Sequence, residues 1–240
     1  MTETLAHYSA LENTLLQRGV QALIIDLDDV FFATAAMYHR HMAQAATLLG
    51  SQPEHQIQAI RHLRPKIYVD PQIMIASITQ VFFDLNLRSV DLLCAAQQCM
   101  LDIFTDIPDL LPGADQATAV LSRFTAVNVC AWTHATPSWT EHKLAAYPQL
   151  RTAFTHVVHT HVYQPKTLAP VLHTLQVAPE QIIVIGDSID SDVRTALSAG
   201  VPPTNVIRIA SSSHVGNDNA IPAGITQTPS LLDALTLLGV

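Results

Sequence analysis

The sequence has little charge and no basic segment. Only 13% of its 240 residues are charged, and 12 Lys and Arg stand against 20 Asp and Glu, which gives a formal net charge of −8. Electrostatic binding of nucleic acid needs basic side chains that neutralise phosphates, so we predict no nucleic-acid partner. Apolar residues make up 49% of the chain, which is enough for a buried core and argues against intrinsic disorder.

Cysteines and long hydrophobic runs are also scarce. The three cysteines, Cys94, Cys99 and Cys130, are an odd number without a C-x-x-C spacing, so we predict neither a disulfide framework nor a zinc site. No uninterrupted apolar run is long enough to span a bilayer, and residues 1–18 lack the apolar centre of a signal peptide. These absences favour a cytoplasmic protein without a membrane partner.

Short apolar runs alternate with helix-length segments along much of the chain. The runs cover residues 21–27, 126–132, 154–159, 181–185 and 206–209. This alternation predicts βαβ units and therefore an α/β fold, a doubly wound parallel, Rossmann-like sheet of about five strands. Residues 211–224 are expected to form a polar loop and 231–238 a closing helix. Ligands of such sheets bind at the carboxyl ends of the strands.

The segment after Phe32 has a helical pattern instead. Its apolar residues recur every three or four positions, as in Tyr38, Met42, Ala45 and Leu49. Breaks between helices are expected at Pro53, Pro65 and Pro71. We therefore predict an all-helical insert at 33–112, with the α/β core formed by 1–32 and 113–240.

Acidic residues follow two of the predicted strands. Asp26 and Asp28 end the first strand, and Asp187 and Asp192 follow the strand at 181–185. Because the carboxyl ends of parallel strands lie at one edge of a sheet, these side chains should meet there. Crowded carboxylates repel one another unless they are protonated or bind a cation, and oxygen ligands alone favour Mg²⁺.

A hydroxyl and an ammonium group are predicted at the same edge. Thr133 ends the second strand, and Lys166, one of three lysines in the chain, follows the third. These groups suit an anionic phosphoryl group. Lys143 is the alternative phosphate lysine, but its position well inside the helix after Thr133 predicts that it points away.

In these residues the chain resembles the haloacid dehalogenase-like hydrolase superfamily. Its four motifs occur in order: DLDDV at 26–30, the apolar strand ending at Thr133, Lys166, and GDSIDSD at 186–192. Asp29 stands where many members have Gly. The predicted helical insert occupies the place of that family's helical cap domain, between the first and second strands.

The resemblance implies a role for each acidic residue. Asp26 would be the nucleophile that forms an aspartyl-phosphate, and Asp28 the general acid and then the general base. Mg²⁺ would be held by the Asp26 carboxylate, the Asp28 main-chain carbonyl and the Asp187 carboxylate, with Asp192 behind. Asp190 competes for the last of these roles, and the motif spacing favours Asp192.

The resemblance also implies a phosphate site and a reaction. Thr133 and the His134 amide would bind phosphoryl oxygens, and Lys166 would neutralise the nucleophile. A halide leaves without a proton, whereas an ester oxygen needs one, so Asp28 favours phosphate esters over haloacids. The prediction is a Mg²⁺-dependent phosphatase of small phosphorylated metabolites. Two alternatives stay open, a phosphomutase and a non-catalytic phosphate-binding or regulatory domain. The sequence ranks no substrate and predicts no oligomeric state.

Overall fold

The computed structural model describes residues 2–49, 71–161, 164–210 and 221–239. The chain divides into two units, one of Met1–Ala33 with Asp109–Val240 and one of Thr34–Pro108. The first unit holds the sheet. The expected breaks at Pro53 and Pro65 and most of the expected loop at 211–224 lie outside the described residues.

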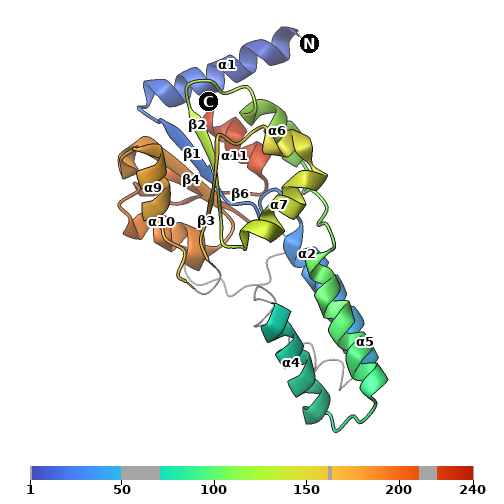
Figure 1. Cartoon of the computed structure of the whole chain (residues 1–240). Coiled ribbons are helices and arrows are strands. Elements are labelled where there is room, and N and C mark those ends of the chain that lie inside the picture. The colour runs from blue at the N-terminus through green and yellow to red at the C-terminus, as the bar shows by residue number, and fades with distance from the viewer. Residues whose placement is uncertain (1, 50–70, 162–163, 211–220, 240) are drawn as a thin grey trace. The chain divides into compact units, whose positions relative to one another are not determined.

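A parallel sheet of six strands forms the first unit (Figure 1). Its strand order is β3-β2-β1-β4-β5-β6, and every pairing is parallel. The strands are β1 (Ala22–Ile25), β2 (Asn128–Thr133), β3 (His156–His159), β4 (Ile182–Gly186), β5 (Val206–Ile209) and β6 (Thr226–Thr228). The predicted doubly wound α/β fold is confirmed. The edge strand β6 was not predicted, because it is three residues long and has no apolar run.

Helices cover both faces of the sheet, so its central strands are apolar throughout. In β1, Leu23 and Ile25 pack with α1, α6 and α11 on one face, whereas Ala22 and Ile24 pack with α9 and α10 on the other (Figure 1). Successive side chains of a strand point to opposite faces, so burial on both faces requires an uninterrupted apolar run. The helices of this unit are α1 (Thr2–Gln17), α6 (Ala114–Leu121), α7 (Pro137–Ala146), α8 (Pro148–Arg151), α9 (Ala169–Leu175), α10 (Arg194–Ser198) and α11 (Leu231–Leu238).

Three short helices precede strands or follow them. The 3₁₀-helices η3 (Pro179–Gln181) and η5 (Pro203–Asn205) lead into β4 and β5, and the π-helix η4 (Ile189–Val193) follows β4. The closing helix predicted at 231–238 is present as α11, whereas the amino-terminal helix α1 was not predicted. The position of η4 determines the geometry of the acidic site described below.

The described elements of the second unit are helices. They are α2 (Thr34–Leu49), α4 (Pro71–Asp84), α5 (Val90–Leu101) and the 3₁₀-helix η2 (Asp102–Phe104). The apolar positions that predicted the first of these helices, from Tyr38 to Leu49, are buried. His41 links α2 to the end of the unit, since its Nδ1 lies 2.9 Å from the Cys99 carbonyl and its Nε2 2.8 Å from Asp106. Among the described residues, no helix is both long and apolar enough to cross a bilayer.

Candidate active site

The register of the sheet brings the ends of three strands to one edge. Ile25 of β1 pairs with Ala131 of β2 and with Ile185 of β4. The chain therefore leaves these strands at nearly the same height, and the residues that follow them are neighbours. Asp26 follows β1 directly, and its amide still donates a hydrogen bond to the carbonyl of Ile185 at 2.9 Å.

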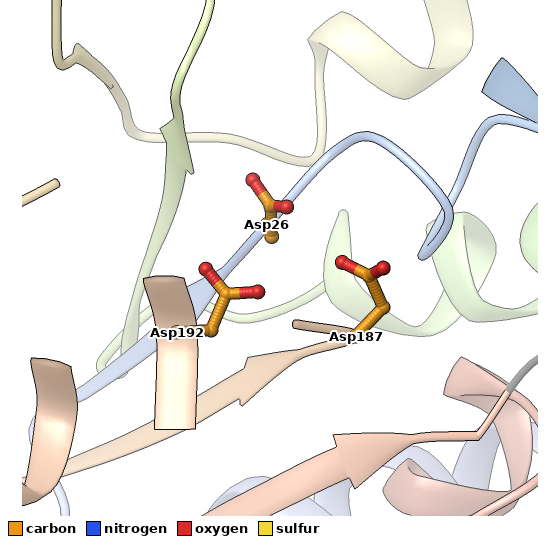
Figure 2. Close-up of side chains that lie close together, drawn as sticks. All are labelled: Asp26, Asp187 and Asp192. Carbon is orange, nitrogen blue, oxygen red and sulfur yellow. The ribbon is translucent and has the colours of Figure 1, made fainter. Parts of the chain in front are cut away.

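Three carboxyl groups converge at this edge (Figure 2). Asp26, Asp187 and Asp192 each offer an oxygen, and these oxygens lie within 4.8 Å of one another. All three residues are buried, although they come from two segments of the chain that are far apart in the sequence. In the described part of the chain they form the one group of side chains arranged to ligate a metal ion.

Lys166 supplies the positive charge next to this acidic group. Its ammonium donates to Asp26 Oδ1 at 3.0 Å and to Asp192 Oδ1 at 2.6 Å, and it lies 4.2 Å from the centroid of the Trp132 ring. Burial alone would lower the pKa of Lys166, but the two carboxylates outweigh burial and raise the pKa above its usual value. Lys166 is therefore a permanent cation that joins two of the three acids.

Asp26 is held in an environment that opposes its ionisation. Burial raises the pKa of its carboxyl group well above the usual range, and Asp192, Asp187 and Asp28 add to the effect, whereas Lys166 opposes it. One ammonium faces three carboxyl groups, so the group is short of positive charge. A divalent cation would supply that charge and favour the ionised carboxylates.

The π-helix η4 selects Asp192 rather than Asp190. The amide of Val193 donates to the carbonyl of Ser188 at 3.1 Å, and this wide turn directs Asp192 back toward β4, where the Ser188 amide donates to Asp192 Oδ2 at 3.0 Å. Asp190 points to solvent and pairs with Arg194.

Gly186 is required for this approach. A Cβ atom at position 186 would lie 2.5 Å from Cβ, Cγ and Oδ2 of Asp192. No larger residue fits there unless the acidic group moves. The glycine of the GDSIDSD motif therefore allows Asp192 to pack closely against the end of β4.

Thr133 and His134, which are predicted to bind phosphate, stand at the end of β2, at the same edge of the sheet as the acids. Thr133 ends β2, and among the residues described its Oγ1 is buried without a hydrogen-bond partner. This buried hydroxyl is therefore available to donate a hydrogen bond to a bound ligand. The ring of His134 donates from Nε2 to the carbonyl of His161 at 3.2 Å and so links the loops after β2 and β3.

Asp28 is not one of the three converging carboxyl groups, although its charge acts on Asp26. Its Oδ1 accepts a hydrogen bond from the ammonium of Lys143 on α7, and the two side chains form an ion pair. The prediction that Lys143 points away is therefore wrong. Trp139, Thr140 and Leu144 lie on the buried face of α7 together with Lys143. This stripe was present in the sequence and is the signal that could have revealed the buried lysine.

Arg208 is a second residue that sequence reasoning missed. It is buried in β5, and its Nε donates to the main-chain carbonyl of Asp187 at 3.2 Å. A second bond joins its guanidinium to Gln227 of the neighbouring strand at 3.1 Å. Arg208 thus fixes the loop that carries Asp187, and the signal was a single charged residue within the apolar run VIRI.

The site residues fit a hard divalent cation. The donors are carboxylate oxygens only, they are buried, and they carry more negative charge than Lys166 compensates. Magnesium prefers such oxygen ligands and is commonly held by one or two carboxylates together with phosphate oxygens. Asp26 and Asp187 suit that role, whereas Asp192 is already bonded to Lys166 and Ser188.

Comparison with known proteins supports the fold. Residues 163–208, which include Lys166, Asp187 and Asp192, match the HAD-hydrolase-like family model. A haloacid dehalogenase-like family hydrolase from Xanthomonas campestris superposes with a TM-score of 0.68 at 18% identity, covering 92% of this chain and 96% of that one. The chain therefore has the haloacid dehalogenase-like hydrolase fold, and the resemblance drawn from its motifs is confirmed.

Structures of proteins described with different activities share the fold. A protein described as a beta-phosphoglucomutase from Thermotoga maritima is 19% identical with a TM-score of 0.66, covering 91% of this chain and 98% of that one. L-2-haloacid dehalogenase from Xanthobacter autotrophicus is 15% identical with a TM-score of 0.64, at the same two coverages. Comparison with curated proteins gave no match. Since one fold carries several reactions, the reaction must be argued from the site.

Proposed function

We propose that this protein is a Mg²⁺-dependent phosphatase that acts on small phosphorylated metabolites through an aspartyl-phosphate on Asp26. The observation that carries the proposal is the buried group in which Lys166 bridges Asp26 and Asp192 beside Asp187. A nucleophilic carboxylate, a fixed cation and neighbouring acids are the parts that phosphoryl transfer through an aspartate needs.

Each residue has a defined part in the proposed reaction. A carboxylate oxygen of Asp26 attacks phosphorus while the bond to the ester oxygen breaks, and Asp28 gives that oxygen a proton. In the second half-reaction Asp28 takes a proton from water, which then attacks the aspartyl-phosphate and releases phosphate. Thr133 and the His134 amide hold phosphoryl oxygens, and Lys166 compensates their charge. Held by Asp26, the Asp28 carbonyl and Asp187, Mg²⁺ would reduce the repulsion between the ester and the nucleophile.

Asp28 favours phosphate esters over haloacids, because only an ester oxygen needs a proton to leave. We further propose that the helical unit inserted between β1 and β2 acts as a cap that shields the site, which favours small substrates. The three free cysteines fit a reducing, cytoplasmic location for this enzyme.

A direct test measures orthophosphate released from a panel of phosphorylated metabolites and from 4-nitrophenyl phosphate, with Mg²⁺ and with a chelator. We expect Mg²⁺-dependent release, and we expect Asp26→Asn to lower it at least about 10³-fold because the nucleophile is lost.

Three outcomes would contradict the proposal. Turnover by Asp26→Asn equal to that of the wild type would reject the aspartyl-phosphate. Isomerisation of a sugar phosphate that requires an added sugar bisphosphate and releases no orthophosphate would favour a phosphomutase. Stabilisation by Mg²⁺ and phosphate without any turnover would favour a binding domain.

A further inference from the structure

The ion pair between Lys143 and Asp28 is unusual because the lysine is fully buried. The Lys143 side chain is 0% exposed, whereas Asp28 is 22% exposed. A buried ammonium loses its hydration and needs compensation from a nearby carboxylate. Asp28 provides that compensation from the loop after β1, although the two residues lie 115 positions apart in the sequence.

Aromatic rings hold the ammonium in place. Lys143 Nζ lies 5.1 Å from the centroid of the Phe32 ring and 5.3 Å from that of Trp139. Both distances are within the range of cation–π attraction. Phe32 is itself fully buried in the core, so the position of the ammonium is fixed by packing rather than by solvent.

The helix that carries Lys143 also carries the phosphate loop. α7 begins at Pro137, four residues after Thr133, with Thr136 as its N-cap. The ion pair therefore ties the loop of Asp28 to the same element that positions Thr133. A general acid must lie within hydrogen-bonding reach of the leaving oxygen, and a carboxylate on a loop needs such a restraint.

We propose that Lys143 is a positioning residue that holds the Asp28 carboxyl group in place for proton transfer to the leaving oxygen. Lys143 binds Oδ1 while the proton passes from Oδ2 to the ester oxygen, as the phosphorus–oxygen bond breaks and the bond from Asp26 to phosphorus forms. Lys143 then compensates the negative charge that Asp28 acquires when its proton leaves. This inference rests on the proposed function, because it assigns a role within the same reaction.

The test compares leaving groups with and without the ammonium. Substrates are 2,4-dinitrophenyl, 4-nitrophenyl and phenyl phosphate, and kcat/KM reports the step in which the phenol leaves. In Lys143→Met we expect kcat/KM to fall about 100-fold for phenyl phosphate but less than about threefold for the dinitrophenyl ester, whose anion leaves without a proton. Asp28→Asn should show the same pattern, and the double variant should lose no more than Asp28→Asn alone.

Controls separate positioning from folding. Arg151→Met removes an exposed cation from the adjacent α8 and should leave every rate unchanged. Lys143→Arg keeps a charged donor and should restore part of the phenyl phosphate rate. The affinity of Lys143→Met for inorganic phosphate, measured by calorimetry, should equal that of the wild type. If Lys143→Met does not fold, the same series is measured on Lys143→Gln, which removes the ammonium but keeps a polar side chain.

The failures are distinguishable. Wild-type protein that hydrolyses none of the esters rejects the proposed function and the role of Lys143 with it. If the wild type is active, an equal fall in kcat/KM for all three esters would show that Lys143 serves the fold. A loss of phosphate affinity would show that Lys143 binds the phosphoryl group. Either result overturns the positioning role. Unchanged rates overturn it as well.

Discussion

Thr133 has a buried hydroxyl group that finds no partner among the described residues. Such a group lowers the stability of the free protein and becomes useful when a ligand accepts its hydrogen bond. We expect Thr133→Val to leave the melting temperature of the free protein unchanged or raised, while affinity for inorganic phosphate falls about 10-fold. Differential scanning fluorimetry and calorimetry measure the two effects.

Thr140→Val is the matched control for this prediction. Its Oγ1 is equally buried without a partner among the described residues, but it lies on α7 rather than at the end of β2. Its removal should leave phosphate affinity unchanged. Equal losses of affinity in both variants would show that the Thr133 hydroxyl has no direct contact with phosphate.

The conformation of Asp29 explains one departure from the family pattern. Its φ of 56° places it in the left-handed region. Glycine adopts this conformation without strain, and aspartate tolerates it better than most other residues do. The chain turns sharply here, since the Asp29 amide donates to the Phe32 carbonyl at 2.8 Å. The Asp-Asp pair after Leu27 is thus compatible with the turn that presents Asp26 and Asp28.

At the scale of the elements, Glu12 attaches α1 to the segment before β2. Its Oε1 accepts hydrogen bonds from the amides of Thr125, Ala126 and Val127 at 2.7, 2.7 and 3.0 Å. Burial alone would raise the pKa of Glu12, but these bonds outweigh burial and lower the pKa below its usual value. The ionised form is therefore bound more tightly in the folded protein than in the unfolded chain.

We expect Glu12→Gln to lower the free energy of unfolding by about 1–2 kcal/mol at pH 7, because charged acceptors make the stronger bonds. Since the folded pKa is depressed, the contribution is fully present above the unfolded pKa of about 4.3 and is lost as the pH falls through the folded pKa. Urea unfolding at pH 7 and at lower pH should show the difference shrinking. Glu180→Gln, at an exposed position in η3, should leave the free energy of unfolding unchanged at each pH. If the destabilisation by Glu12→Gln stayed constant with pH, the role of the charge would be contradicted.

Strand ends were predictable from the sequence, but the rotation of a helix was not. Asp26 and Asp187 follow apolar runs, and the parallel topology alone brings such residues to one edge. The orientation of Lys143 depends on which side of α7 faces the core, and its position well inside that helix had predicted that it points away. Motif spacing favoured Asp192 over Asp190. The physical reason is the wide turn of η4, which the spacing of apolar residues does not predict.

At the scale of the whole molecule, the acidic site links metal binding to stability. The three carboxyl groups repel one another in the folded state, and a cation bound there stabilises only that state. We expect Mg²⁺ at about 100 times its dissociation constant to stabilise the protein by about 2.7 kcal/mol, which is roughly 5–10 °C in melting temperature. Thermal unfolding at constant ionic strength measures the shift.

Asp187→Asn removes one of the expected ligands and should abolish the shift. The same concentration of charge supplied as KCl should produce no shift, since screening acts on exposed charges more than on buried ones. An equal rise in melting temperature in wild type and variant would place the Mg²⁺ effect elsewhere on the protein.

The chain leaves the unit that holds the sheet after Ala33 and returns to it at Asp109, and these two places are paired with each other. Phe32 and Leu110 form an antiparallel bridge, and the Ala33 amide donates to the Asp109 carbonyl at 2.8 Å. The main chain thus departs and returns through adjoining, hydrogen-bonded positions, and the entropy of closing a longer loop grows only slowly with its length. Such a junction allows the intervening segment to be lengthened or exchanged while the acidic edge of the sheet keeps its geometry.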